Sequence, residues 1–296
     1  MKDKQNIEFI KEMKDRLDAF HNAMEERELL QKQLQEVNRK LQDAEAFKSH
    51  FIARISNEFI NPFTAILTIS DNLRKGKFSD QKELQKMIGY VYDEAMFLDF
   101  QLKNLFTAAK IEAGEIERDI ETVYPAKLIN EVLKEYDKEM EKKKLQLEKT
   151  FGFPQNSVFI TDKGKLELIV KNLLSNAIKF SDRESKVTLE SRLTDGKLFF
   201  EVENQGTPIT EEQLEVIFDR FRQLDNRIHS LNPGSGIGLS ICRELAELLN
   251  GEIHAVRTNN GIRFMVTLPE MQTDMVESDD NKIFFKNGDT ESGDTL

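Results

Sequence analysis

Cysteine, tryptophan and long hydrophobic runs are scarce or missing in this 296-residue sequence, which has one cysteine, Cys242, and no tryptophan. A single cysteine excludes an internal disulfide, which favours a reducing, cytoplasmic compartment. A membrane-spanning helix needs about 20 consecutive apolar residues, and no run approaches that length, so we expect no membrane span. The start of the chain, Met-Lys-Asp-Lys-Gln, is polar, and we expect no secretion signal.

An excess of basic residues is also absent, because the formal net charge is −11. This charge argues against nucleic acid as a main partner. The length predicts about two domains. Charged residues make up 32% of the chain and hydrophobic residues 39%, which is typical of a soluble protein with a large helical or coiled-coil part.

The N-terminal segment has the pattern of a coiled coil. Residues 1–55 contain neither proline nor glycine, and apolar residues recur at steps of three or four between charged ones. This pattern predicts a parallel dimeric coiled coil, which we interpret as a signal-transmitting helix over residues 1–46. The register slips near residues 25–28, which locally over- or underwinds such a coil; loose packing explains the slip equally well.

Two further helices are predicted on either side of a break at residues 75–80. The second runs from about Gln81 to Ala113 with apolar residues at helical spacing, and Gly114 suits the position just after a helix. A helical hairpin that pairs with a second copy makes a four-helix bundle. We therefore predict a dimerisation domain over residues 47–118.

Residues 119–270 have the pattern of an α/β sandwich. A helix is expected at 126–144 and another after Asp162, and strands are expected at 157–161, 186–193, 197–203, 253–257 and 263–268. Helices on one side of a mixed sheet form such a sandwich. The tail, residues 271–296, holds seven acidic residues and two lysines and is predicted to be disordered.

The stretch from Asn172 to Phe180 combines two amides and an ammonium on one helix face. Asn172, Asn176 and Lys179 stand at i, i+4 and i+7. Asparagine is a poor residue for the middle of a helix, so its repetition asks for a reason. Amide oxygens suit Mg²⁺, and a neighbouring lysine suits phosphate. The alternative is a polar face turned to water.

This stretch resembles the asparagine box of the histidine kinase and GHKL ATPase superfamily, and the order of elements over most of residues 121–270 resembles the Bergerat ATP-binding fold. The resemblance implies an α+β multidomain protein, in which a coiled coil and a dimeric four-helix bundle precede a GHKL-type α/β sandwich. It also implies that ATP and Mg²⁺ are cofactors, with Asn176 and Asn172 as metal ligands and Lys179 at the nucleotide.

The segment from Val202 to Ile209 resembles the first glycine box of that superfamily. Gly206 keeps one of its glycines, Asn204 replaces the aspartate that accepts a hydrogen bond from the adenine amino group, and Pro208 replaces the second glycine. An amide oxygen still accepts that bond but loses charge assistance, on the order of 1 kcal/mol. Proline also restricts the backbone where glycine permits close approach, so we expect weakened binding.

Two more segments resemble nucleotide-binding motifs in the expected order. Phe218 to Phe221 resembles the phenylalanine box, which makes Arg220 and Arg222 candidates for the triphosphate; solvated arginines are the alternative. The run at 234–240 resembles the second glycine box, where backbone amides and a helix N-terminus approach phosphate. Its candidate residues are Gly234, Gly236, Gly238 and Leu239.

The helix at 47–63 resembles the dimerisation and phosphoacceptor helix of histidine kinases, but Asn57 stands where the family has its phosphoacceptor histidine. An amide nitrogen does not accept a phosphoryl group because its lone pair is delocalised. His50, one heptad earlier, is an alternative acceptor. Glu58 matches the family acid that polarises the histidine, and Asn61 matches the position that helps orient water for dephosphorylation of a response regulator. Drift after loss of the histidine is the alternative for both.

We therefore predict a homodimeric, histidine-kinase-like two-component signalling protein that does not autophosphorylate. It would act as a scaffold or phosphatase cofactor on a response regulator receiver domain or on another histidine kinase. One alternative is an active kinase that phosphorylates the histidine of a partner in trans. Another is a structural dimer with an empty pocket.

Overall fold

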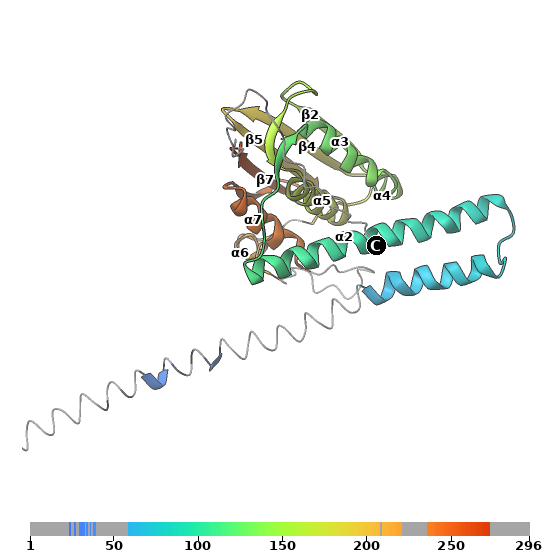
Figure 1. Cartoon of the computed structure of the whole chain (residues 1–296), viewed down its shortest axis with the longest axis horizontal. Coiled ribbons are helices and arrows are strands. Elements are labelled where there is room, and N and C mark those ends of the chain that lie inside the picture. The colour runs from blue at the N-terminus through green and yellow to red at the C-terminus, as the bar shows by residue number, and fades with distance from the viewer. Residues whose placement is uncertain are drawn as a thin grey trace, which may run out of the picture. The chain divides into compact units, whose positions relative to one another are not determined.

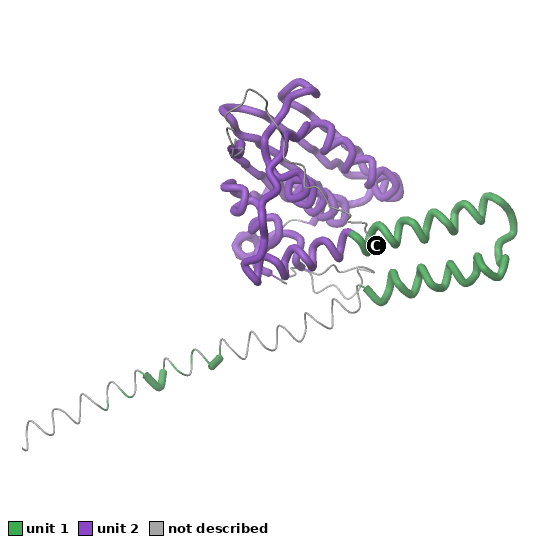
Figure 2. Tube along the Cα trace, in the orientation of Figure 1, with its two compact units in different colours: residues 1–99, 229–235 green, residues 100–228, 236–296 purple. Residues whose placement is uncertain are grey.

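The computed structural model describes residues 59–207, 209–220 and 236–272, together with helical positions between 24 and 39 (Figure 1). The rest of the predicted coiled coil and nearly all of the predicted disordered tail lie outside the described residues. Within the described part, none of the helices is long and apolar enough to cross a membrane. The chain divides into two compact units, residues 1–99 with 229–235 and residues 100–228 with 236–296 (Figure 2).

The first unit contains a helical hairpin. One helix covers residues 59–74, and after a turn in which Gly76 has a φ of 65°, helix α2 (Gln81–Ala113) begins. Asp80 accepts a hydrogen bond from the Glu83 amide, and the Glu83 carboxylate accepts from the Ser79 amide, so the start of α2 has a reciprocal cap. The bounds of α2 and the break before it are those predicted from the sequence.

The second unit contains the last turns of α2 and an α/β domain. Its further elements, in chain order, are β1 (Ile120–Val123), α3 (Pro125–Glu135), α4 (Asp137–Lys143), β2 (Gln146–Phe151), β3 (Phe159–Asp162), α5 (Lys163–Phe180), β4 (Lys186–Thr194), β5 (Lys197–Gln205), α6 (Glu211–Val216), α7 (Gly238–Leu248), β6 (Glu252–Thr258) and β7 (Gly261–Pro269).

The main sheet has five strands in the order β2-β4-β5-β7-β6, and only the β2–β4 pair is parallel. The tight turn between β4 and β5 has positive φ at both Asp195 (52°) and Gly196 (67°), which matches the hairpin predicted there. The strand predicted at 157–161 corresponds to β3, which pairs with β1 outside the main sheet. The helix predicted over 126–144 is divided at Tyr136 into α3 and α4.

Helices α3, α5 and α7 cover one face of the main sheet (Figure 1). Helix α5 is the centre of this layer, and its apolar stripe is almost completely buried. On β5, residues alternate between the two faces of the sheet, so that Leu198, Phe200 and Val202 face the helices. The mixed α+β fold predicted from the sequence is confirmed, with its core between α5 and the sheet.

Candidate functional site

Helix α5 carries the central polar residues of the candidate site. It begins where the side chain of Asp162 accepts a hydrogen bond from the Lys165 amide (2.9 Å). Of its three predicted site residues, Asn172 is buried with 4% exposure, whereas Asn176 and Lys179 are partly exposed. The alternative of a polar face turned to water is therefore wrong for Asn172.

Hydrogen bonds orient the buried amide of Asn172. Its Nδ2 donates to the backbone oxygen of Leu168 (2.9 Å) and to Oδ1 of Asn104 in α2 (2.7 Å). Its Oδ1 lies against Gly238 in the first turn of α7, because a Cβ added at that glycine would come within 2.4 Å of this oxygen. The asparagine helix and the second glycine segment thus meet at one side chain.

The C-terminal end of α5 meets the first glycine segment. Ser181 and Gly206 form a β-bridge, and a Cβ at Gly206 would lie 2.0 Å from the backbone oxygen of Phe180. Such close backbone contact admits only glycine. Asn204 is 2% exposed and lies on the helix-covered face of β5, where the neighbouring positions are apolar. The structure therefore brings Asn204 and Gly206 to the end of α5 that carries Lys179; Pro208 lies outside the described residues.

A lysine that the sequence reasoning missed holds this end of α5. Nζ of Lys143, at the end of α4, donates to the backbone oxygens of Ile178 (2.8 Å), Lys179 (2.7 Å) and Ser181 (3.1 Å). A cation at a helix C-terminus satisfies carbonyls that the helix itself leaves without partners. Burial lowers the pKa of Lys143, and the nearby Asp182 opposes that shift. The run of three lysines at 142–144 gave no sign of which one would be used.

The second glycine segment leads into α7. Gly236 has a φ of 71°, a conformation that glycine adopts at little cost, and Gly238 and Leu239 begin the helix. The residue before the helix, Ile237, is apolar and provides no side-chain hydrogen bond to the first amides. Gly234, like Arg222, lies outside the described residues.

Arg220 is held by an acid and does not stand free in solvent. Its Nε donates to Oε1 of Glu244 in α7 (2.6 Å). This hydrogen bond raises the pKa of the Arg220 guanidinium; burial opposes that shift, and Glu244 and Glu112 add to it as nearby negative charges. The solvated alternative for Arg220 is wrong, and its assignment to the triphosphate stays a prediction.

The predicted phosphoacceptor region is only partly covered. Asn57, Glu58 and His50 lie outside the described residues. Asn61 is exposed on the helix at 59–74. The sequence analysis also did not identify Asn104, which contacts Asn172. Asn104 is an asparagine in the middle of a helix, and this is the same signal that identified Asn172.

Comparison with known proteins places these features in a family context. The sequence model of the histidine kinase-, DNA gyrase B- and HSP90-like ATPase family matches residues 161–272. The chain is 29% identical over 240 residues to the sensor protein KdpD of Clostridium acetobutylicum, covering 80% of this chain and 26% of that protein. It is also 29% identical over 232 residues to the circadian input-output histidine kinase CikA of Synechococcus elongatus, covering 77% of this chain and 31% of that protein.

A solved structure shows the same fold. Full-length ShkA, crystallised in complex with AMPPNP, superposes with a TM-score of 0.53 at 21% sequence identity, over 75% of this chain and 46% of that one. Of the curated relatives KdpD and CikA, by contrast, the chain spans only between a quarter and a third of the length.

Proposed function

Because the chain belongs to the histidine kinase family of two-component sensors, we propose that it binds ATP with Mg²⁺ and regulates a partner without phosphorylating itself. The observation that carries this proposal is the convergence around α5. Asn172 meets the second glycine segment at the middle of the helix, and Asn204 and Gly206 lie at its C-terminal end with Lys179.

The residues present fit a magnesium nucleotide. Gly238 packs against the Asn172 side chain and Gly206 against the Phe180 backbone oxygen, so both glycine segments are held at α5. Asn172 and Asn176 supply amide oxygens, the hard ligands that Mg²⁺ prefers. Asn204 supplies an acceptor for the adenine amino group from an otherwise apolar face, and Lys179 supplies a cation for phosphate.

The chain's own residues then determine what happens to the phosphoryl group. When bound, Mg²⁺–ATP supplies an electrophilic γ-phosphoryl group. Asn57 presents an amide where the family has an imidazole, and its nitrogen is not a nucleophile. We infer that the protein uses nucleotide binding as a signal and does not store the phosphoryl group on its first bundle helix.

The proposed target is a response regulator receiver domain. Asn61 is exposed, so its amide is available to hold a water by hydrogen bonds without any covalent step. The helical hairpin also exposes large apolar side chains on both helices, which supports pairing with a second copy. They include Ile60, Phe63, Leu67, Ile88 and Tyr92.

A second candidate function follows from the same asymmetry. The nucleotide residues are retained while the acceptor is replaced, which favours a kinase that transfers phosphate in trans to the histidine of a partner kinase. The trans-acting kinase would use the same nucleotide site as the non-autophosphorylating regulator, and the two functions differ only in the fate of the phosphoryl group. Label recovered on a histidine of the partner would favour the trans-acting kinase.

The test measures nucleotide binding and label retention on the dimeric full chain. Calorimetry is expected to show Mg²⁺-dependent binding of ATP, and incubation with γ-labelled ATP is expected to leave no acid-labile label. The Asn57→His variant is the positive control for the acceptor position. Acid-labile label on a wild-type peptide from residues 47–63 would overturn the proposal, and absence of nucleotide binding would leave only a structural dimer.

A phosphorylated receiver domain tests the regulatory part. If Asn61 orients water, the wild-type protein shortens the lifetime of the receiver phosphate and Asn61→Ala removes most of that effect. Lys82→Ala, an exposed change at the start of α2, is the control. An equal lifetime with both proteins would reject the phosphatase role and keep the scaffold role.

A further inference from the structure

The last turns of α2 bury one asparagine, although apolar side chains beside it are exposed. Asn104 is 3% exposed, whereas its neighbours Leu102 and Phe106 are 38% and 61% exposed. Asn104 and Ala108, one helical turn apart, are the buried residues of this stretch. Because a buried amide needs hydrogen-bond partners, the burial of Asn104 directs attention to the contact that it makes.

Two acceptors, Asn104 and Leu168, together fix the orientation of the Asn172 amide. The backbone oxygen of Leu168 can only accept, so the atom of Asn172 that faces it must be the donor Nδ2. The second proton of the same nitrogen is donated to Oδ1 of Asn104. With both protons used, the amide oxygen is turned toward Gly238 and the start of α7.

We propose that Asn104 is a positioning residue that holds the amide oxygen of Asn172 toward the magnesium nucleotide. The inference rests on the proposed ATP site and adds to it a residue from the last turns of α2. A rotated amide would present its NH₂ group, which cannot ligate a cation. Groups that orient metal ligands in this way typically contribute 10–100-fold to metal affinity.

The proposal links α2 to nucleotide binding. Because Asn104 lies in the last turns of α2, a nucleotide that needs the Asn172 orientation also stabilises the hydrogen bond between these turns and α5. The coupling is reciprocal, so a change that withdraws Asn104 from Asn172 weakens Mg²⁺-dependent binding.

The experiment compares nucleotide binding with and without Mg²⁺ in the full chain. ADP is titrated calorimetrically in Mg²⁺ and in EDTA for the wild type, Asn104→Leu and Asn104→Asp. Leucine has a similar size but no acceptor, and we expect about a tenfold loss of affinity in Mg²⁺ with little change in EDTA. Aspartate keeps an acceptor for Nδ2 of Asn172, and we expect it to restore most of the Mg²⁺-dependent affinity.

The controls separate a positioning role from a merely structural one. Lys110→Gln, an exposed change on the same helix, is expected to match the wild type. Equal losses in Mg²⁺ and in EDTA would overturn the proposal, because a structural defect affects both. Tighter binding by Asn104→Leu would also overturn it, since the contact would then be an inhibitory latch.

Two further observations keep the test decisive. If Asn104→Leu does not fold, Asn104→Ser takes its place, with the same sign expected, because its hydroxyl is too short to reach Nδ2 of Asn172. In the ligand-free wild type, the side-chain NH₂ protons of Asn172 are expected to exchange slowly, and to exchange faster in Asn104→Ser. Absence of any nucleotide binding by the wild type would reject the proposed function itself, whereas Mg²⁺-dependent binding unchanged in the variants would reject only the role of Asn104.

Discussion

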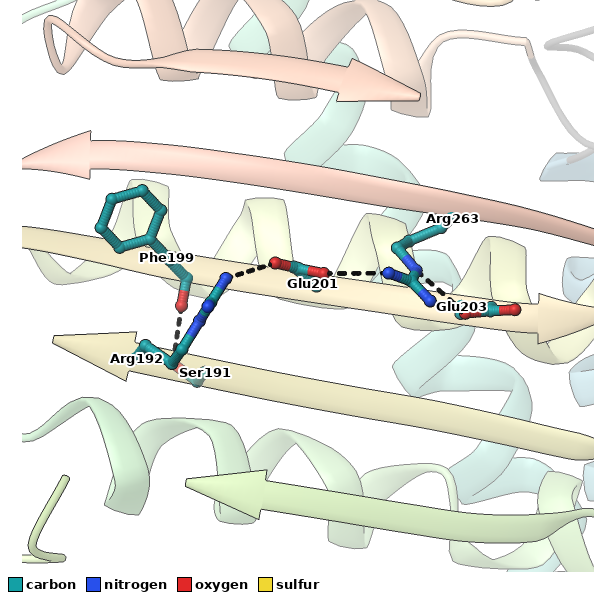
Figure 3. Close-up of polar contacts among 6 residues, drawn as sticks. All are labelled: Ser191, Arg192, Phe199, Glu201, Glu203 and Arg263. Atoms are coloured by element: carbon teal, nitrogen blue, oxygen red, sulfur yellow. Dashed lines mark hydrogen bonds and ion pairs between the residues drawn. The ribbon is translucent and has the colours of Figure 1, made fainter. Parts of the chain in front are cut away.

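The two faces of the five-stranded sheet use the same strands for different purposes. On the helix-covered face, Phe200 is 1% exposed and packs with its apolar neighbours beneath α5. On the open face, Arg192 binds Glu201 (2.8 Å) and Arg263 binds Glu203 (2.6 Å), and these side chains lie in a line along the strands (Figure 3). Burial of apolar surface is a strong stabilising term, whereas exposed ion pairs contribute little.

The comparison also shows where to look for function. The ion pairs Arg192–Glu201 and Arg263–Glu203 are conspicuous on the open face, but their charges neutralise one another at the surface. Asn204 is the informative residue, because it continues the covered face of β5 with a buried amide where an apolar side chain would pack better. A polar residue on a covered face points to a ligand more strongly than a charged residue on an open one.

The largest expected effect tests the two faces at adjacent residues. Phe200→Ala removes a buried ring beneath α5 and is expected to lower the free energy of unfolding by about 3–5 kcal/mol. Phe199→Ala, on the open face, loses a partly exposed ring that lies near the Arg192 guanidinium (5.8 Å) and is expected to cost less than half as much. Urea unfolding of both variants measures the difference. Equal losses would show that the open face is also packed.

The second prediction concerns the close approach at the start of α7. Gly238→Ala places a Cβ 2.4 Å from Oδ1 of Asn172, and we expect a loss of about 1–3 kcal/mol in stability together with weakened nucleotide binding. Gly164→Ala, in the first turn of α5, meets nothing closer than 3.6 Å and is the matched control. There we expect no loss, or a gain of up to about 1 kcal/mol. A tolerated alanine at position 238 would contradict the tight junction.

Much of the fold could be predicted because its signals are local. The break before helix α2 and the residues that cap the helix can be recognised in the sequence. The β4–β5 turn likewise has Asp195 and Gly196 at the two positions that need positive φ. Strand β2 was missed, since its residues are mostly exposed and show no alternation. Its parallel partner β4 lies across α5 in the chain, so no neighbouring turn could reveal the pairing.

In the candidate site, too, residues in local motifs could be identified from the sequence, whereas residues that act through distant contacts could not. Asn172, Gly206 and Gly238 could be singled out because the asparagine and glycine segments are recognisable by themselves, and their roles at a nucleotide stay predictions. Asn104 and Lys143 could not, because each acts through a contact distant in sequence; Asn104 meets Asn172 across 68 positions. Neither a helical asparagine nor one lysine among three shows in the sequence which distant atom it will bind.

The smallest expected effect lies on the open face, at Arg263. Its guanidinium binds Glu203 through Nε (2.9 Å) and Nη2 (2.6 Å), and Nη1 lies 3.7 Å from Glu201; the bond to Glu203 raises the pKa of Arg263. Because this side chain is 42% exposed, solvent screens the attraction, and Arg263→Met is expected to cost no more than about 1 kcal/mol.

Salt distinguishes the electrostatic part of that small loss from packing. At 1 M salt the screening length falls to about 3 Å, so the difference between Arg263→Met and the wild type should shrink. Arg257→Met, on the exposed side of β6, is the matched change of charge. A loss above about 2 kcal/mol that persisted in high salt would mean that the aliphatic stem and charges of Arg263 hold β5 and β7 together. The open face would then rank with the covered one as a source of stability.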